Sequence, residues 1–372
     1  MDKKNDSFLA RFRGWFQAGA ALLTNIHLPN FAKGVLYQGK GKTVCVPGLN
    51  CYSCPGAAGA CPIGSFQAVV GSSKFRFSYY ITGILILLGV LLGRFICGFL
   101  CPFGWLQELL HKIPSPKCST KRLKPLRYLK YAVLLIMVVL LPALVVNEMG
   151  MGDPFFCKYL CPQGVLEGAI PLSLANSGIR AALGKLFTWK FSILLSVIAL
   201  SVLFYRPFCK WLCPLGAFYA LFNRVSLFQM KVDKSKCVSC GKCARACKMD
   251  VDVTKTPNHT ECIRCGMCIR ACPTGAVCFR YGFGDGQDKQ TLAAKAPQVE
   301  RLDPERRILL TPREWLRVRV WKQLVVPVLP LIPVVILLAL EPHMSGIVLT
   351  VAVVGLSLIH ISEPTRPRLI SY

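Results

Sequence analysis

Charged residues, and acidic residues in particular, are scarce in this chain of 372 residues. Asp, Glu, Lys and Arg make up only 17% of it, whereas a soluble domain carries about 25%. Hydrophobic residues reach 53%, which excludes a disordered chain, because disordered chains are poor in such residues. The composition therefore predicts a membrane protein with a soluble part, and it excludes an ordinary water-soluble globular protein.

The 18 Asp and Glu residues are outnumbered by 45 Lys and Arg residues, which gives a formal net charge of +27. A nucleic-acid-binding protein can have such an excess. A protein with several membrane spans also has one, because its cytoplasmic loops are enriched in Lys and Arg. We favour the membrane interpretation and expect no nucleic-acid partner.

A C-x-x-C-H motif is absent, so the chain has no covalent attachment site of the c-type haem kind. Its five histidines are too scattered to predict a haem or metal site. Cysteine is abundant instead, with 20 residues, and all except Cys118 and Cys278 fall into repeated clusters. The chemistry is therefore predicted to depend on cysteine.

Apolar stretches of sufficient length predict membrane spans. The strong ones are residues 77–95, 131–146, 189–205 and 324–340, and weaker ones are residues 14–28 and a last segment from Met344. The loop after the first strong span is rich in Lys and Arg, so the positive-inside rule places it, and the chain after residue 205, in the cytoplasm. Residues 14–28 would then have to cross; a re-entrant or interfacial helix is the alternative.

Residues 237–272 contain the pattern C-x2-C-x2-C-x3-C twice. Two such runs are typical of bacterial ferredoxins with two clusters, in which the fourth cysteine of each run binds the other cluster. The predicted ligands are Cys237, Cys240, Cys243 and Cys272 for one [4Fe–4S] cluster, and Cys262, Cys265, Cys268 and Cys247 for the second. A zinc ribbon normally has two C-x2-C pairs, and a cytoplasmic location disfavours disulfides.

A second motif, C-[GK]-[FYW]-L-C-P-x-G, occurs three times. Its cysteine pairs are Cys97 and Cys101, Cys157 and Cys161, and Cys209 and Cys213. Cysteines at i and i+4 share one helix face, and a proline disfavours helix at the residue before it. We therefore expect the second cysteine of each pair at a helix end. Two facing helix ends would supply the four thiolates that a cluster or a tetrahedral metal ion needs.

The predicted topology sorts these cysteines into an inner and an outer group. The inner group is Cys97, Cys101, Cys209 and Cys213, and the outer group is Cys157 and Cys161 with Cys45, Cys51, Cys54 and Cys61. We favour a cluster or metal ion for the inner group, with free thiols that only pack helices as the alternative. For the outer group, a metal site and disulfides both remain open.

Glu108 and His111 lie one helical turn apart, just after the first repeat of this motif. They could relay a proton from a quinol. A solvated helix face is the interpretation that we favour.

The C-x3-C-P motifs together with a C-terminal two-cluster ferredoxin segment resemble the NapH/NosR-type membrane 4Fe–4S binding proteins, over residues 12–280. The resemblance implies two C-x3-C-P motifs, carried most naturally by the Cys97 and Cys209 pairs. It also implies electron transfer from a membrane donor, as in a quinol dehydrogenase subunit. The third motif and the N-terminal cysteines depart from the family pattern, so they leave the redox partner open.

The expected fold is a mainly α polytopic membrane protein with a small α+β ferredoxin-like domain inserted before the last spans. The predicted segments are a weak membrane segment and Cys-rich loop (1–76), a transmembrane core (77–230), the ferredoxin-like domain (231–282), a basic linker (283–323), the last spans (324–355) and an adapter-derived tail (356–372). The expected location is a bacterial plasma membrane.

The expected function is electron transfer between a membrane donor, for which we favour quinol from the quinone pool, and a redox partner protein. Membrane lipid surrounds the spans in this interpretation. A redox-sensing or metalloenzyme-maturation protein without steady-state turnover is the alternative.

Overall fold

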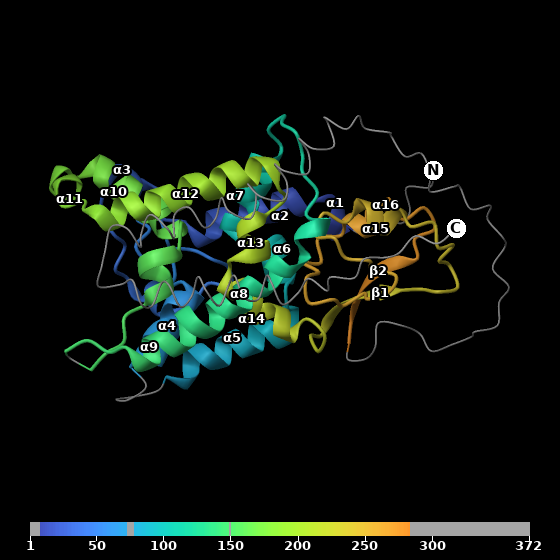
Figure 1. The fold of residues 1–372 in the computed structure, drawn as a ribbon, viewed down its shortest axis with the longest axis horizontal. Helices are drawn as coiled ribbons and strands as arrows, with labels where there is room; N and C mark the ends of the chain where they lie inside the picture. The colour runs from blue at the N-terminus through green and yellow to red at the C-terminus, as the bar shows by residue number, and fades with distance from the viewer. Residues whose placement is uncertain (1–7, 73–77, 149, 283–372) are drawn as a thin grey trace, which may run out of the picture. The chain divides into compact units, whose positions relative to one another are not determined.

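The computed structural model describes residues 8–72, 78–148 and 150–282. The predicted basic linker, the last two spans and the adapter-like tail lie outside the described residues. The described part is mainly helical, and a small module with a two-stranded sheet follows the helices (Figure 1). This agrees with the fold class expected from the sequence, except that the spans after the module lie outside the description.

The described secondary-structure elements follow one another along the chain in a fixed order. They are α1 (Phe8–Arg11), α2 (Arg13–Thr24), α3 (Pro29–Lys33), η2 (Lys40–Thr43), α4 (Pro62–Gly71), α5 (Tyr79–Leu92), α6 (Phe95–Phe99), α7 (Pro102–His111), η3 (Lys121–Tyr128), α8 (Leu129–Val133), η4 (Leu134–Leu140), α9 (Leu141–Leu144), η5 (Phe156–Leu160), η6 (Gly164–Ala169), α10 (Ile170–Ala175), α11 (Ser177–Ala181), α12 (Lys185–Leu203), α13 (Pro207–Trp211), α14 (Pro214–Phe222), β1 (Phe228–Val232), α15 (Lys242–Ala246), α16 (Met267–Ala271) and β2 (Val277–Tyr281). The segments η4, η5 and η6 are wound as π-helix.

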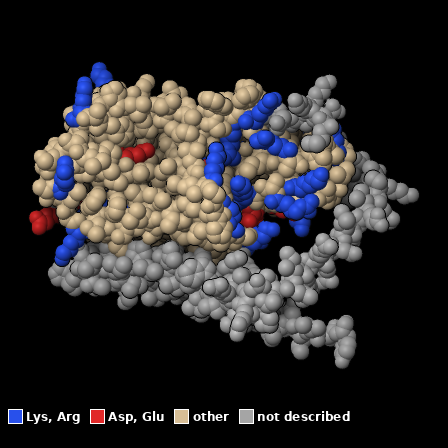
Figure 2. Space-filling view, turned by 90° about the horizontal axis from the view of Figure 1, so that it is seen from above, with Lys and Arg blue, Asp and Glu red and all other residues tan. Residues whose placement is uncertain are grey.

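Two helices among the described residues are long and apolar enough to cross a membrane: Leu123–Leu144 and Lys185–Leu203. They coincide with the predicted spans at 131–146 and 189–205. Figure 2 shows Lys and Arg gathered towards the two ends of the molecule, with a band of few charges between them. A charge-poor band between basic ends suits a protein that sits in a bilayer.

The other two predicted spans in the described part are shorter helices. The span at 77–95 becomes α5, which ends at Leu92 because Gly93 takes a left-handed backbone (φ 54°) and turns the chain. The weak segment at 14–28 becomes α2, with 12 residues. At 1.5 Å per residue, α2 is about 18 Å long, too short for a hydrocarbon core of about 30 Å. Its length suits the re-entrant or interfacial alternative.

The ferredoxin-like module is built on β1 and β2, which pair antiparallel with Met230 opposite Phe279. Its core contains Met230, Val253 and Ile269, and several of its cysteines pack against this core. Strand β1 begins at Phe228, shortly before the predicted domain start at residue 231. The helices α15 and α16 each have a glycine as N-cap and a cysteine as C-cap. The two halves of the module therefore have the same local structure.

Buried ion pairs fasten this module to the helices. Glu261 accepts hydrogen bonds from Arg94 Nη1 at 2.9 Å and from Lys130 Nζ at 2.6 Å, and all three side chains are almost fully buried. Arg264, also buried, donates to the carbonyl oxygens of Leu92 at 2.8 Å and Asn223 at 2.6 Å. These bonds join the module to α5, α8 and the end of α14.

Burial alone would raise the pKa of Glu261, but the charges of Arg94 and Lys130 more than offset it and hold the pKa at about 2. The lowered pKa means that ionised Glu261 stabilises the folded protein. This contribution is complete above the unfolded pKa of about 4.3 and is lost as the pH falls towards 2.

We expect Glu261→Gln to destabilise the protein by about 3–5 kcal/mol at pH 7, because it leaves two buried cations without a counter-charge. The thermal unfolding midpoint in lipid nanodiscs measures the effect, and its difference from the wild type shrinks only below about pH 4.3. Glu148→Gln, the same substitution at an exposed glutamate of the helical part, is the control and leaves the midpoint unchanged. Equal midpoints for Glu261→Gln and the wild type would contradict this account.

A second prediction concerns Gly98 on α6, where an added Cβ would overlap the carbonyl oxygen of Ile263. Gly98→Ala should therefore destabilise the contact between α6 and the module by about 1–3 kcal/mol. Gly83→Ala on α5 is the matched control, because nothing lies within 4 Å of its added Cβ. The control should be neutral or slightly stabilising. A Gly98→Ala protein that unfolds at the wild-type temperature would refute the contact.

Candidate functional site

The two cysteine-rich loops of the module have the same backbone path. Ser239 and Gly241 in the first loop, and Arg264 and Gly266 in the second, have φ between 51° and 77°. Alternation of right- and left-handed residues turns successive N–H groups into one concavity, the arrangement that surrounds many iron–sulfur sites. The loops therefore have the backbone that the predicted cluster ligands require.

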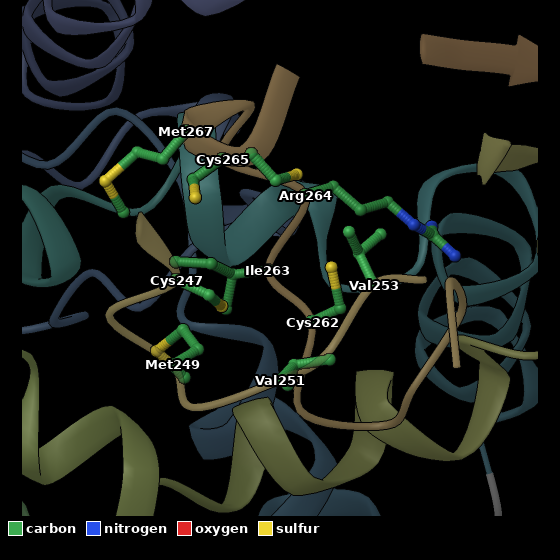
Figure 3. Close-up of a pocket in the computed structure, with 10 residues that line it drawn as sticks. Cys247, Met249, Val251, Val253, Cys262, Ile263, Arg264, Cys265 and Met267 are labelled. Atoms are coloured by element: carbon green, nitrogen blue, oxygen red, sulfur yellow. The ribbon is translucent and has the colours of Figure 1, made fainter. Parts of the chain in front are cut away.

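The predicted second cluster group lies around one pocket (Figure 3). The structure brings Cys262, Cys265, Cys268 and Cys247 to this pocket from two separate segments of the chain. Apolar side chains such as Met249 and Val251 complete the wall, and Arg264 extends away towards the helices. Four thiols around an apolar cavity form the donor set of a [4Fe–4S] cluster.

Burial raises the pKa of the Cys262 thiol to about 11, and burial together with the neighbouring Cys262 raises the pKa of Cys268 further. Cluster binding requires thiolates, so the chain alone would hold these sulfurs protonated. Iron binding would therefore release protons, which couples cluster assembly to the pH.

The predicted first cluster group is associated with the module core. Cys237 and Cys272 pack against that core, and Cys243 belongs to it. Cys272 Sγ accepts a hydrogen bond from the backbone N–H of Ala276 at 3.3 Å. Cys240 is exposed, so this group lies nearer to solvent than the second one.

The predicted inner group is also brought together. Cys97 lies on α6 and Cys209 on α13, whereas Cys101 and Cys213 are the N-cap residues of α7 and α14. The four thiols are buried and lie near one another. As the sequence predicts, the second cysteine of each pair lies at a helix end, and the proline after it opens the next helix.

Two fully buried arginines connect the two cysteine motifs of this inner group. Arg94, three residues before Cys97, donates to the carbonyl oxygen of Cys209 at 3.4 Å. Arg206, three residues before Cys209, donates to the carbonyl oxygen of Cys97. The exchange is reciprocal, so each arginine ties its own motif to the other one.

Small residues and an amide complete the inner group. A Cβ on Gly104 would lie 2.9 Å from Arg206 Nη1, so the glycine of the C-P-x-G tetrad leaves room for the guanidinium. Gln107 Nε2 donates to Cys209 Sγ at 3.1 Å. Gln107 is fully buried, so this donor is fixed on one sulfur.

The favoured interpretation of Glu108 as part of a solvated helix face is wrong. Glu108 is nearly buried, forms an ion pair with Arg206 at 2.9 Å and pairs with Arg13. It also accepts a hydrogen bond from Tyr205 Oη. Polar residues at one-turn spacing look solvated in sequence, but here α2 and α13 cover this face and supply the counter-charges. His111 is partly buried, and its Nδ1 lies 3.3 Å from the Ser201 carbonyl oxygen.

The six predicted outer cysteines divide into a group of four and two separate residues. Cys51, Cys61, Cys157 and Cys161 line one cavity, whereas Cys45 and Cys54 are absent from its wall. All twenty cysteines lie within the described residues, and none of them forms a disulfide. Cys61 is the N-cap of α4, the same place that Cys101 and Cys213 occupy at their helices.

The thiols of the second module group and of the outer group each surround a space. Among residues 8–72, 78–148 and 150–282, no three Cys, His, Asp or Glu side chains lie close enough to hold a single metal ion. A tetrahedral zinc site would need sulfurs about 3.8 Å apart, given Zn–S bonds of about 2.3 Å. The arrangement fits a polynuclear cluster better, because each of its irons takes one thiolate.

Arg94, Arg206 and Gln107 were not singled out from the sequence. A signal for the two arginines exists, because both inner motifs read R-x2-C-x3-C-P-x-G. The tetrad C-P-x-G itself also occurs outside the three full repeats, at Cys61 and at Cys272 in the module.

Comparison with known proteins supports this architecture. A family model described as a 4Fe–4S binding domain matches residues 59–79, 77–121, 130–170 and 187–235. Each of these four segments contains one C-P-x-G tetrad. A second model, described as a 4Fe–4S dicluster domain, matches residues 229–273. No solved structure matches the chain.

Among curated proteins, an uncharacterized protein of Methanocaldococcus jannaschii is 31% identical over 210 residues, which are 54% of this chain and 77% of the relative. The putative electron transport protein YccM of Escherichia coli is 29% identical over 180 residues, 46% of this chain and 45% of YccM. The ferredoxin-type protein NapH of Haemophilus influenzae is 27% identical over 150 residues, 29% of this chain and 52% of NapH.

The matched segments contain the cysteine groups that the fold brings together, and the relatives named above include a putative electron transport protein and a ferredoxin-type protein. The chain belongs to the family of ferredoxin-type membrane proteins with 4Fe–4S binding domains, and it is an iron–sulfur protein of electron transport.

Proposed function

We propose that the chain carries electrons between quinol in the membrane and a soluble redox partner protein. The ferredoxin-like module would hold two [4Fe–4S] clusters on the ligands predicted above, and the inner group would hold a further one. Bound clusters would supply one-electron redox chemistry that amino-acid side chains lack. The single observation that carries the proposal is the contact between the inner group and the module.

This contact involves α6, the helix that carries Cys97. Gly98, the next residue, lies directly against the backbone of Ile263, and Ile263 lies between Cys262 and Cys265 in the module. The absence of a side chain at Gly98 therefore brings a membrane cysteine motif and a cluster-binding loop together. Such close approach is what electron transfer between two sites needs.

The exposed face of the module suits a partner with an acidic surface. Cys240 is exposed, and several exposed basic side chains surround it in the sequence: Lys234, Lys236, Lys242, Arg245 and Lys248. Opposite charge on a partner would accelerate its association, and the effect would weaken with salt. We therefore place the exchange with the soluble partner at this face.

Quinol as the electron donor is supported by the location of the inner group. That group lies in the buried interior of the helical part, and a donor that reaches it from the bilayer must itself be soluble in lipid. The ion-paired Glu108 and Tyr205 lie beside Arg206, next to the same group. They provide fixed polar groups beside the inner group.

A redox-sensing or maturation protein remains the second candidate, because the regulatory protein NosR of Pseudomonas aeruginosa is 26% identical over 168 residues. Quinol oxidation by the purified protein in lipid, with a one-electron acceptor in solution, distinguishes the two. Sustained oxidation over many turnovers supports the electron carrier. A single stoichiometric event supports the sensor, and no oxidation at all refutes the quinol donor.

We further expect Cys262→Ser to abolish the signal of one module cluster in electron paramagnetic resonance and to stop electron flow from quinol to the soluble acceptor. The reason is that Cys262 supplies one of the four thiols of that pocket. Cys278→Ser is the matched control, since Cys278 is exposed on β2 and lies outside both groups. An unchanged signal in Cys262→Ser would disprove the ligand assignment.

A further inference from the structure

The outer cysteines surround a cavity of about 420 Å³. Its wall is formed by the N-terminal loop with Cys51, the start of α4 with Cys61, and the segment around η5 with Cys157 and Cys161. The segment around η5 is far from the other two in the sequence. The cavity is therefore built by the tertiary fold.

This cavity repeats the plan of the inner group. Gln67 Nε2 donates to Cys157 Sγ at 3.2 Å, as Gln107 Nε2 donates to Cys209 Sγ. Both glutamines are fully buried, and each lies six residues after the cysteine of a C-P-x-G tetrad. In each case the amide crosses to the first cysteine of the opposite motif.

A cation also occupies the corresponding place in both groups. Lys190 Nζ donates to the carbonyl oxygen of Cys157 at 3.0 Å, as Arg206 does to that of Cys97. A Cβ on Gly164, the glycine of the outer tetrad, would lie 3.3 Å from Lys190 Nζ. Lys190 also lines the cavity, where its charge would offset the negative charge of thiolate ligands.

The remaining two outer cysteines are directed elsewhere. Cys54 Sγ donates to Asn25 Oδ1 at 3.4 Å. Cys45 forms a backbone bridge with Ala60, and its thiol interacts with Ser65. The six outer cysteines predicted from sequence therefore reduce to four that share one space.

We propose that Cys51, Cys61, Cys157 and Cys161 bind a [4Fe–4S] cluster in this cavity, distinct from the one in the inner group, and that Cys45 and Cys54 remain free thiols. The proposal rests on the proposed function in one respect: it takes the inner group as the template of a cluster site. Gln67 is assigned as a positioning residue that tunes the outer cluster through its bond to Cys157.

The loop before Cys51 packs against the inner group, since a Cβ on Gly48 would lie 2.9 Å from Cys101 Cα. Tyr219, on α14, is fully buried. Its Oη donates to the carbonyl oxygen of Pro47 at 3.0 Å, in the loop that leads to Cys51. Tyr219 thus joins α14, the helix that Cys213 caps, to the loop of the outer group.

The test uses the full chain, purified without oxygen in lipid nanodiscs and supplied with iron and sulfide. Cys157→Ser should lose about four iron and four sulfide ions per chain, the content of one cubane cluster. The module signals in electron paramagnetic resonance should persist and thereby show that the variant is folded. Cys54→Ser, a buried cysteine of the same region, is the matched control and should keep the wild-type iron content.

Three results would overturn the proposal. Cys157→Ser could keep the wild-type iron content, Cys54→Ser could lose as much iron as Cys157→Ser, or alkylation without reductant could find Cys51 and Cys61 joined in a disulfide. Each of these leaves the module signals intact. Failure of the proposed function is distinguishable, because it would appear as missing module signals in the wild type or as no electron flow from quinol.

Gln67→Leu tests the positioning role without removing a ligand. Hydrogen bonds to ligand sulfur raise the reduction potential of a cluster, so the midpoint potential of the outer signal should fall while the iron content stays constant. Gln107→Leu is the matched comparison and should lower the potential of the inner signal only. An outer potential that does not move in Gln67→Leu would refute the assigned bond.

Discussion

The bond between a cysteine and the proline after it is the constraint on which the helical part of this protein depends. Proline cannot continue the preceding helix, yet its fixed φ suits the first position of the next one. Cys61, Cys101 and Cys213 consequently become N-caps, each at a junction where the chain changes direction. The backbone N–H groups at such a junction have no partner within the helix. A sulfur there can accept one of them, as Cys213 Sγ does from Gly216 at 3.4 Å.

Buried charge is the second organising feature. Arg94, Arg206 and Glu261 are nearly inaccessible to water, which is costly unless every charge is paired. Here they are paired across segments: Arg94 with Glu261 of the module, and Arg206 with Glu108 of α7. The same arginines also bond the carbonyl oxygens of the opposite cysteine motif. One set of interactions thus fixes both the inner cysteine group and the position of the module against it.

The features of this arrangement that depend on local sequence rules, such as cysteine spacing and proline geometry, could be predicted from the sequence. The spacing of cysteines in the module indicates two groups of four, and the structure brings Cys247 to the pocket of Cys262, as the spacing predicts; ligation itself stays a prediction. The helix ends at Cys101 and Cys213 follow from proline geometry alone. The outer group could not be resolved, because the path of the loop from Cys45 to Cys61 depends on contacts with distant helices. Glu108 was misjudged for the same reason, since its partners Arg13 and Arg206 are far away in the sequence.

The cysteines differ in exposure, and this difference determines which of them oxygen attacks first. Cys240 is open to solvent, whereas the inner thiols are enclosed by helices. Oxidants attack accessible sulfur first and convert it stepwise to acids that no longer bind iron. Damage by oxygen should therefore begin at Cys240, on the face where we propose that a soluble partner binds. A protein injured in this way would lose its exposed cysteine group first, while its enclosed cysteine groups stayed intact.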